Sequence, residues 1–94
     1  MHTTIRQYSG SGAEDLFNAL EQRESEVREL ISGVPGFVSY TAFRTGDGGT
    51  TVTVCEDRAG TDESTRRAAA WVAENVDVSI GAPSITEGDV FLQF

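Results

Sequence analysis

Apolar side chains recur after a short first strand at the spacing of an amphipathic helix. "TTIRQY" is rich in strand-forming residues and is followed by "SGSG", which ends the strand. From Ala13 onward an apolar stripe repeats every three or four residues, with the members Leu16, Leu20, Val27, Ile31 and Val34. Glu14 and Asp15 stand where the helix dipole favours negative charge, and Ser32-Gly33 supplies a stop. The pattern predicts one long helix between these points.

The stretch from 37 to 56 reads as a hairpin with apolar side chains on both faces. Asp47-Gly48 suits a two-residue turn, and a four-residue loop from Gly46 to Gly49 gives the same pairing. The expected partners are Thr45 with Thr50, Phe43 with Val52, Thr41 with Val54, Ser39 with Glu56, Ala42 with Thr53 and Tyr40 with Cys55. One face then carries Phe37, Phe43, Val52 and Val54, and the other carries Val38, Tyr40 and Ala42. A sheet with one wet face would alternate cleanly, so we expect both faces to be covered.

A second helix and a last strand complete the pattern. Thr61 can cap a helix whose stripe holds Ala68, Ala69, Val72 and Val76. "DVSIGAPSITEGD" predicts a polar connection of limited structure, and "VFLQF" predicts the final strand. The order β-α-β-β-α-β is that of an α+β, ferredoxin-like fold, a four-stranded antiparallel sheet with two helices on one face. A second copy of the chain is the natural cover for the other face, which predicts a homodimer joined sheet to sheet, a dimeric α+β barrel.

Composition limits the partners. The 94 residues form a single domain, 1–94, and the net charge of -8 would repel nucleic acid and anionic membrane surfaces. No apolar run approaches the roughly 20 residues of a membrane helix. Cys55 is the only cysteine, and the N-terminal stretch lacks the apolar core of a signal peptide. We therefore expect a cytoplasmic protein that binds neither nucleic acid nor membrane.

The hairpin and the segment after it resemble the antibiotic biosynthesis monooxygenase-like family of dimeric α+β barrel proteins. The shared features are the length, the order of elements, "VPGFVSYTAFR" before a Gly/Asp turn, and "VTVCED" before an acidic helix start. The resemblance covers nearly the whole chain. It implies a homodimer with a small pocket between helices and sheet in each subunit. It also implies cofactor-independent oxidation of polyphenolic or quinone-type substrates, or oxidative haem breakdown.

This chain departs from the family at positions that carry function in other members. Arg58 stands two residues after Glu56, where many members have a tryptophan, and "TDESTRRAAA" has no histidine early in the second helix. Haem-degrading relatives use an asparagine on the first strand, but "TTIRQY" contains none, and His2 is the only histidine. These differences disfavour haem degradation.

Three residues are candidates for catalytic work, each with a purely structural alternative. Trp71, at the edge of the second helix's stripe, can wall a pocket and donate its N–H to a substrate, or pack as core. Tyr40 can orient a phenol or quinone through its hydroxyl, or pack in an interface. Glu56, beside Ser39 and Val54, can act as a general base because desolvation disfavours the charged carboxylate. Its alternative is an ion pair with an arginine, Arg6, Arg44 or Arg58.

No residue pattern indicates a metal or cofactor site. One histidine, one cysteine and scattered carboxylates cannot form a closed zinc shell. "GDGG" lacks the lysine of a phosphate-binding loop and is interpreted as a turn. Cys55 has no histidine near it in the sequence to activate its thiol, so a small core residue is the favoured interpretation.

Two functions from different classes remain open, and the sequence leaves undecided whether the protein is an enzyme. The first is a cofactor-independent monooxygenase for a small aromatic or quinone-type metabolite, which would use Trp71, Tyr40 and Glu56. The second is a non-catalytic homodimer that binds a small ligand or serves as an accessory protein. The missing family tryptophan and histidine favour the second slightly.

Overall fold

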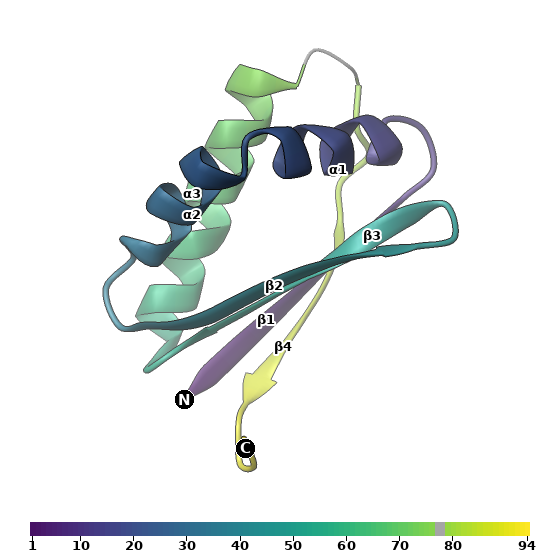
Figure 1. The fold of residues 1–94 in the computed structure, drawn as a ribbon. Coiled ribbons are helices and arrows are strands. Elements are labelled where there is room, and N and C mark those ends of the chain that lie inside the picture. Colours follow the sequence, from purple (N-terminus) through teal and green to yellow (C-terminus); the bar gives the residue numbers. More distant parts are fainter. Residues whose placement is uncertain (77–78) are drawn as a thin grey trace.

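Three helices cover one face of a four-stranded antiparallel sheet (Figure 1). The computed structural model describes residues 1–76 and 79–94. The elements in chain order are β1 (His2–Ser9), α1 (Ala13–Gln22), α2 (Glu24–Ser32), β2 (Phe37–Thr45), β3 (Gly48–Cys55), α3 (Arg58–Asn75) and β4 (Ser84–Asp89). The strands lie in the order β2-β3-β1-β4. This arrangement confirms the predicted ferredoxin-like fold. No helix of the described ranges is both long and apolar enough to cross a membrane.

The predicted long first helix is two helices, so this part of the prediction was wrong. The helical path breaks at Arg23, whose φ of -115° and ψ of 36° lie outside the helical range. The Arg23 guanidinium binds Glu26 at 2.8 Å and lies over the Trp71 ring, 5.6 Å from its centroid. These contacts accompany a break that the apolar stripe does not reveal, because the same face stays buried on both sides of it.

The helix α3 begins one turn earlier than predicted. Its N-cap is Asp57, whose side chain accepts a hydrogen bond from the Gly60 N–H at 3.2 Å. Thr61, the predicted cap, lies inside the helix and donates instead to the Arg58 carbonyl at 3.1 Å.

The hairpin register differs from the prediction by two residues. The turn is Gly46-Asp47 and pairs Thr45 with Gly48, and neither turn residue has a positive φ. A slip of two residues keeps each side chain on its predicted face, because side chains alternate with period two. The exception is Phe37: an irregularity before Ser39 places it opposite Cys55, on the face the helices cover.

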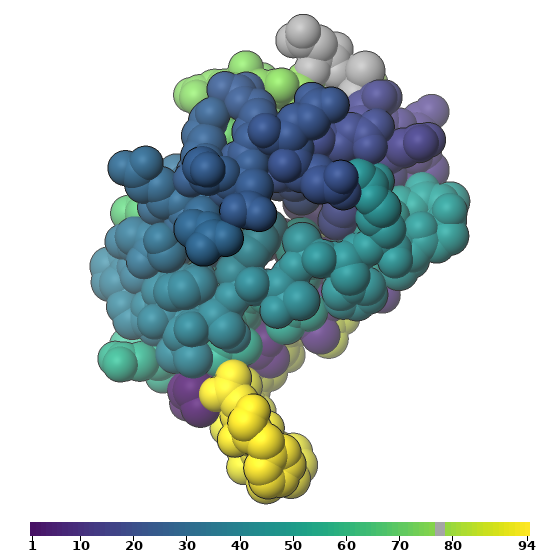
Figure 2. All heavy atoms as spheres, viewed as in Figure 1, coloured from purple at the N-terminus to yellow at the C-terminus, as the bar shows by residue number. Residues whose placement is uncertain are grey.

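The last strand lies earlier in the chain than predicted. Residues 84–89, interpreted from the sequence as part of a polar connection, form β4 and pair with β1, while positions 77–78 of that connection lie outside the described residues. The segment 90–94, predicted to be the strand, has no strand structure and leaves the body of the subunit as a tail (Figures 1 and 2). Its large side chains are strongly exposed: Phe91 by 89%, Leu92 by 66% and Phe94 by 113%.

The two faces of the sheet hold different side chains. Arg6 binds Thr65 and His2 binds Thr61, both on α3, so the even-numbered residues of β1 face the helices. Their buried neighbours on this face are the polar side chains Thr4, Thr51 and Thr53. The opposite face carries Ile5, Val52, Thr41 and Phe43, and none of the three helices covers it (Figure 1).

Candidate functional site

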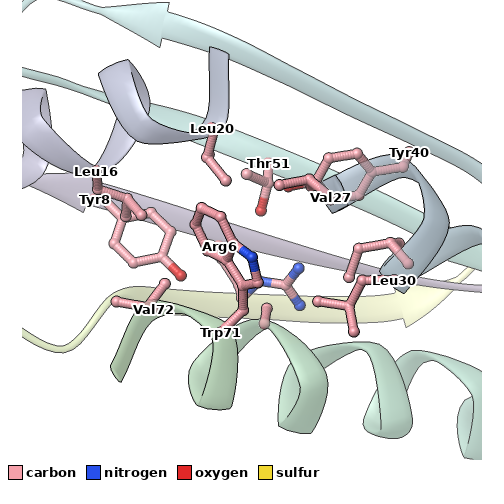
Figure 3. Close-up of a pocket in the computed structure, with 12 residues that line it drawn as sticks. Arg6, Tyr8, Leu16, Leu20, Val27, Leu30, Tyr40, Thr51, Trp71 and Val72 are labelled. Atoms are coloured by element: carbon pink, nitrogen blue, oxygen red, sulfur yellow. The ribbon is translucent and has the colours of Figure 1, made fainter. Parts of the chain in front are cut away.

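A small cavity lies between the helices and the covered face of the sheet (Figure 3). Its volume is about 20 Å³, which holds about one water molecule. Aliphatic and aromatic side chains form most of the wall, which consists of Arg6, Tyr8, Leu16, Leu20, Val27, Leu30, Ile31, Tyr40, Thr51, Ala68, Trp71 and Val72. All three helices and the strands β1, β2 and β3 contribute.

A wider groove lies beside this cavity, between the helices α1 and α2 and the edge strand β2. Its volume is about 1,020 Å³, and the surface is visibly hollowed between these helices and β2 (Figure 2). Four residues line both spaces and so form the boundary between them: Leu20, Val27, Ile31 and Tyr40. A ligand entering from solvent would therefore reach the cavity past Tyr40.

Arg6 is the only charged side chain in the cavity wall. Its side chain projects from β1 toward the helices, and the residue is 2% exposed. The guanidinium donates to Thr65 Oγ1 at 2.9 Å and to Thr53 Oγ1 at 3.4 Å, while its Nε has no partner. Within the described ranges, no carboxylate oxygen lies within 4.0 Å of the guanidinium nitrogens. Arg6 is thus a buried cation without a counterion, which is a costly arrangement.

Two tyrosines flank Arg6 in the close-up view (Figure 3). Burial raises the pKa of Tyr8 and of Tyr40 above the ordinary tyrosine value, and the positive charge of Arg6 offsets only part of that rise. No hydrogen bond of normal length and angle joins either hydroxyl to Arg6. The ring of Tyr8 packs edge-on against Phe17, with 6.0 Å between ring centroids. Both hydroxyls stay protonated at neutral pH and can donate a hydrogen bond.

Trp71 forms a wall of the cavity from α3 and is 7% exposed. Its indole N–H donates to Glu26 Oε1 at 2.9 Å. Glu26 also binds Arg23, which covers the indole ring at the junction of α1 and α2. Because Glu26 occupies the N–H, the indole meets the cavity with its ring carbons.

The structure brings two of the three sequence candidates together. Tyr40 and Trp71 both line the cavity. Glu56 is exposed beyond the end of β3, lines neither the cavity nor the groove, and donates its backbone N–H to the Gly36 carbonyl at 2.8 Å. Among the described ion pairs, Arg44 binds Glu21 and Arg58 binds Asp62 and Glu87, so Glu56 is bound to none of its predicted arginine partners.

Sequence reasoning missed Arg6 and Thr51 as parts of the site. The signal available was the alternation in β1, which places Arg6 on the same face as Tyr8 and opposite to Ile5. Apolar patterning alone favours a buried side chain for Ile5 and a solvent-exposed side chain for Arg6. The packing of α3 against β1 reverses that expectation.

The histidine and the cysteine lie outside the cavity. His2 Nδ1 is 2.6 Å from Thr61 Oγ1, and its Nε2 is 3.5 Å from Glu87. Cys55 is fully buried, and this desolvation, followed by the nearby Asp57 charge, raises the pKa of its thiol, which makes it a poor nucleophile. In the part of the chain that the structure describes, no group of three or more histidine, cysteine, aspartate or glutamate side chains could hold a metal ion.

Comparison with known proteins identifies the fold. No protein-family model and no curated protein matches the chain. The monooxygenase ActVA-Orf6 of Streptomyces coelicolor, solved with the ligand nanaomycin D, has 19% identity and a TM-score of 0.65, covering 98% of this chain and 92% of that one. SnoaB, a cofactor-independent oxygenase from Streptomyces nogalater, has 17% identity and a TM-score of 0.64, with coverages of 98% and 94%.

A third structure with this fold has a different activity. The haem-degrader MhuD from Mycobacterium tuberculosis, solved with two haems in its active site, is 20% identical with a TM-score of 0.69, and the match covers 100% of this chain and 99% of that one. At such low identities the likeness establishes architecture. The chain has the fold of the antibiotic biosynthesis monooxygenase-like proteins, as its sequence resemblance predicted.

Proposed function

We propose that the protein binds a small aromatic or quinone-type molecule between its helices and its sheet and oxidises it with molecular oxygen, without a cofactor. The observation that carries this proposal is the aromatic cavity beside an open groove, where Tyr8, Tyr40 and Trp71 surround one cation. Aromatic side chains recognise aromatic rings through offset and edge-on packing. The groove of about 1,020 Å³ offers the volume of a typical small-molecule site, and the inner cavity offers the polar groups.

The proposed reaction uses electrons from the substrate. An activated ring CH₂ group reacts with O₂ and is converted to a ring carbonyl. One oxygen atom of O₂ becomes the carbonyl oxygen, and the other takes the two CH₂ hydrogens and is released as water. The four electrons that reduce O₂ come from the substrate carbon, so no external reductant is needed. The protein's contribution is a dry site and a fixed orientation of the ring. Tyr40, which lines both the groove and the cavity, would donate a hydrogen bond to a ring oxygen, and Trp71 would contact the inner end of the ligand from the cavity wall.

Haem is a poor fit to this cavity. Among the described residues, no histidine lines the cavity or the groove to bind iron. The histidine of the chain lies next to Thr61 instead. We therefore do not extend the activity of MhuD to this chain.

The same proposal includes a homodimer. Ile5, Val52 and Phe43 share the face opposite the helices, and Phe43 is 48% exposed. Ile5 and Val52 are half-buried, and the tail after β4 adds the exposed side chains Phe91, Leu92 and Phe94. Exposed apolar side chains outside the core favour association, and a second copy would cover the same residues on both subunits.

A second candidate is a non-catalytic protein of the same dimeric fold that binds a small ligand. Two observations favour it: no carboxylate or histidine lines the cavity to act as a general base, and the Trp71 N–H is held by Glu26. The aromatic site would be the same in both cases. Only turnover separates the two candidates.

Oxygen consumption by purified protein distinguishes them. Anthrone-type and hydroquinone substrates are supplied in air, and uptake above the protein-free rate is expected, with Tyr40→Phe and Trp71→Phe reducing it roughly tenfold or more. Glu29→Gln, at an exposed position of α2, is the matched surface control and should retain the full rate. Saturable binding with no substrate-dependent uptake would support the binding protein and contradict the oxygenase.

A further inference from the structure

We infer that the inner end of this site is an anion receptor: Arg6 and Thr51 bind an oxyanion, a carboxylate or an ionised phenol or enol, carried by the aromatic ligand. This inference rests on the proposed aromatic site and adds the charge of its ligand. Arg6 Nε and Thr51 Oγ1 are both buried and lack a hydrogen-bond partner of normal length and angle, although Thr51 lies near the Tyr40 hydroxyl, and the two residues line the same cavity. They belong to paired strands, at directly opposed positions of β1 and β3.

The charge argument comes from the surroundings of Arg6. A guanidinium that is 2% exposed would normally be neutralised by a carboxylate, since an unpaired buried charge is strongly unfavourable. The chain has an excess of acidic residues, 15 Asp and Glu against seven Arg and Lys. No ion pair among the described residues uses Arg6, and the groups that bind Arg6 are neutral threonine hydroxyls. The missing negative charge is therefore assigned to the ligand.

The donor geometry selects an oxyanion. The Nε–H of Arg6 and the hydroxyl of Thr51 have no partner of normal hydrogen-bond geometry, and the protonated hydroxyls of Tyr8 and Tyr40 lie near them (Figure 3). A planar oxyanion accepts several such hydrogen bonds, and those from a charged donor are the strongest. A neutral ring would bring no negative charge, so Arg6 would remain a buried cation without a counterion.

The position of these groups sets the orientation of the ligand. The ring fits the groove, because the cavity of about 20 Å³ has no room for it, and the oxyanion points inward past Tyr40. A phenol or enol held in this way would ionise more easily, because a buried cation stabilises the charged form. The protein would then supply an electron-rich anion for reaction with O₂ without a general base in the wall.

Matched ligands that differ only in charge test the inference. Calorimetric titrations compare 2-naphthoate with 2-naphthamide, and 2-anthroate with its amide, on the full chain. We expect each carboxylate to bind roughly 10- to 100-fold more tightly than its amide, the range expected of hydrogen bonds to a charged group. Arg6→Gln should abolish that preference while the amides bind as before. Arg66→Gln, at an exposed arginine of α3 that binds only Glu63, should keep the preference.

The other outcomes are also decisive. Equal affinity for carboxylate and amide, unchanged by Arg6→Gln, would overturn the anion receptor and leave the aromatic site standing. Failure of all four compounds to bind would overturn both. Arg6→Lys, which keeps the charge but loses the planar fork, is a second variant if Arg6→Gln folds poorly, and it should keep a reduced preference.

Discussion

The two faces of the sheet are built by the same strands, yet the face under the helices buries a guanidinium and several hydroxyl groups. Under the helices, β1 and β3 present His2, Thr4, Arg6, Thr51 and Thr53, all of them buried. On the opposite face, Ile5, Val52 and Phe43 are apolar, and no helix covers them. Burying hydroxyl groups and a guanidinium is unfavourable unless each polar atom forms a hydrogen bond. The covered face therefore has the buried polar groups of a binding site, and the open face has a cluster of apolar side chains, Ile5, Val52 and Phe43, at which we propose the dimer contact.

A lysine placed on each face in turn should have the largest effects, and the two effects should differ in kind. Thr51→Lys puts a second cation beside Arg6 and should destabilise the subunit by about 3–5 kcal/mol, enough to unfold a marginal domain. Val52→Lys, one residue along and on the other face, should leave a folded subunit but separate the dimer. Circular dichroism reports folding, and light scattering reports mass.

The mass of the wild-type protein is the control for that experiment. A dimer of twice 10.1 kDa is expected at micromolar protein, and Val52→Lys should return it to the monomer mass. A wild-type monomer would contradict the proposed interface. A folded, stable Thr51→Lys protein would contradict the account of the covered face.

Removing the buried charge should stabilise the empty protein. Arg6→Met fills a similar volume without a charge, and we expect unfolding free energy to rise by about 1–3 kcal/mol while the carboxylate preference disappears. Denaturant titration measures the change. Arg66→Met, at an exposed position, should stay within about 0.5 kcal/mol of wild type. A large loss of stability in Arg6→Met would show that Arg6 is structural.

The tyrosines give a smaller and more local test of the same face. The pKa of Tyr8 and of Tyr40 is raised by burial above the ordinary 10.0, so in the folded state both lose their protons at higher pH than in the unfolded state. Their contribution to stability is complete below pH 10 and is lost as pH rises through the folded values. Phenolate absorbance should show both transitions above those of the denatured chain. Since these are the only tyrosines, a transition at the denatured value would place one of them in water.

The sequence was sufficient for the order of the strands and of the two helical regions, because helix and strand periods differ clearly along most of the chain, but it did not show that the first helical region is two helices. Sequence reasoning misplaced the last strand, because main-chain pairing with β1 decides where that strand lies. Residues 84–89 are polar and exposed, and they form a strand only because their main chain continues the ladder of β1. The strongly apolar segment 90–94 has β propensity but no strand to pair with inside the subunit. Propensity is a weaker guide than pairing at a sheet edge.

The site was predictable in part for a related reason. Tyr40 and Trp71 are large aromatic residues, one on an apolar face of the hairpin and one at the edge of a helix stripe, which made them candidates, but the sequence left open which face of the hairpin the helices cover. Arg6 is hidden from such reasoning, because charge normally indicates solvent exposure. The register slip of two residues and the break at Arg23 leave no trace in the alternation, since both preserve the buried face. Glu56 was selected by its place in the sequence, and its strand ends before it can reach the cavity.

The most direct test of the central claim, an aromatic ligand site under the helices, is the fluorescence of Trp71. It is the only tryptophan, it lines the cavity, and it therefore reports on that site without interference. Titration with phenols, quinones and 2-naphthoate should quench its emission saturably, with 2-naphthoate stronger than 2-naphthamide. Emission that stays unchanged up to millimolar concentrations of every compound would mean that Trp71 is plain core and that no aromatic ligand binds at this site.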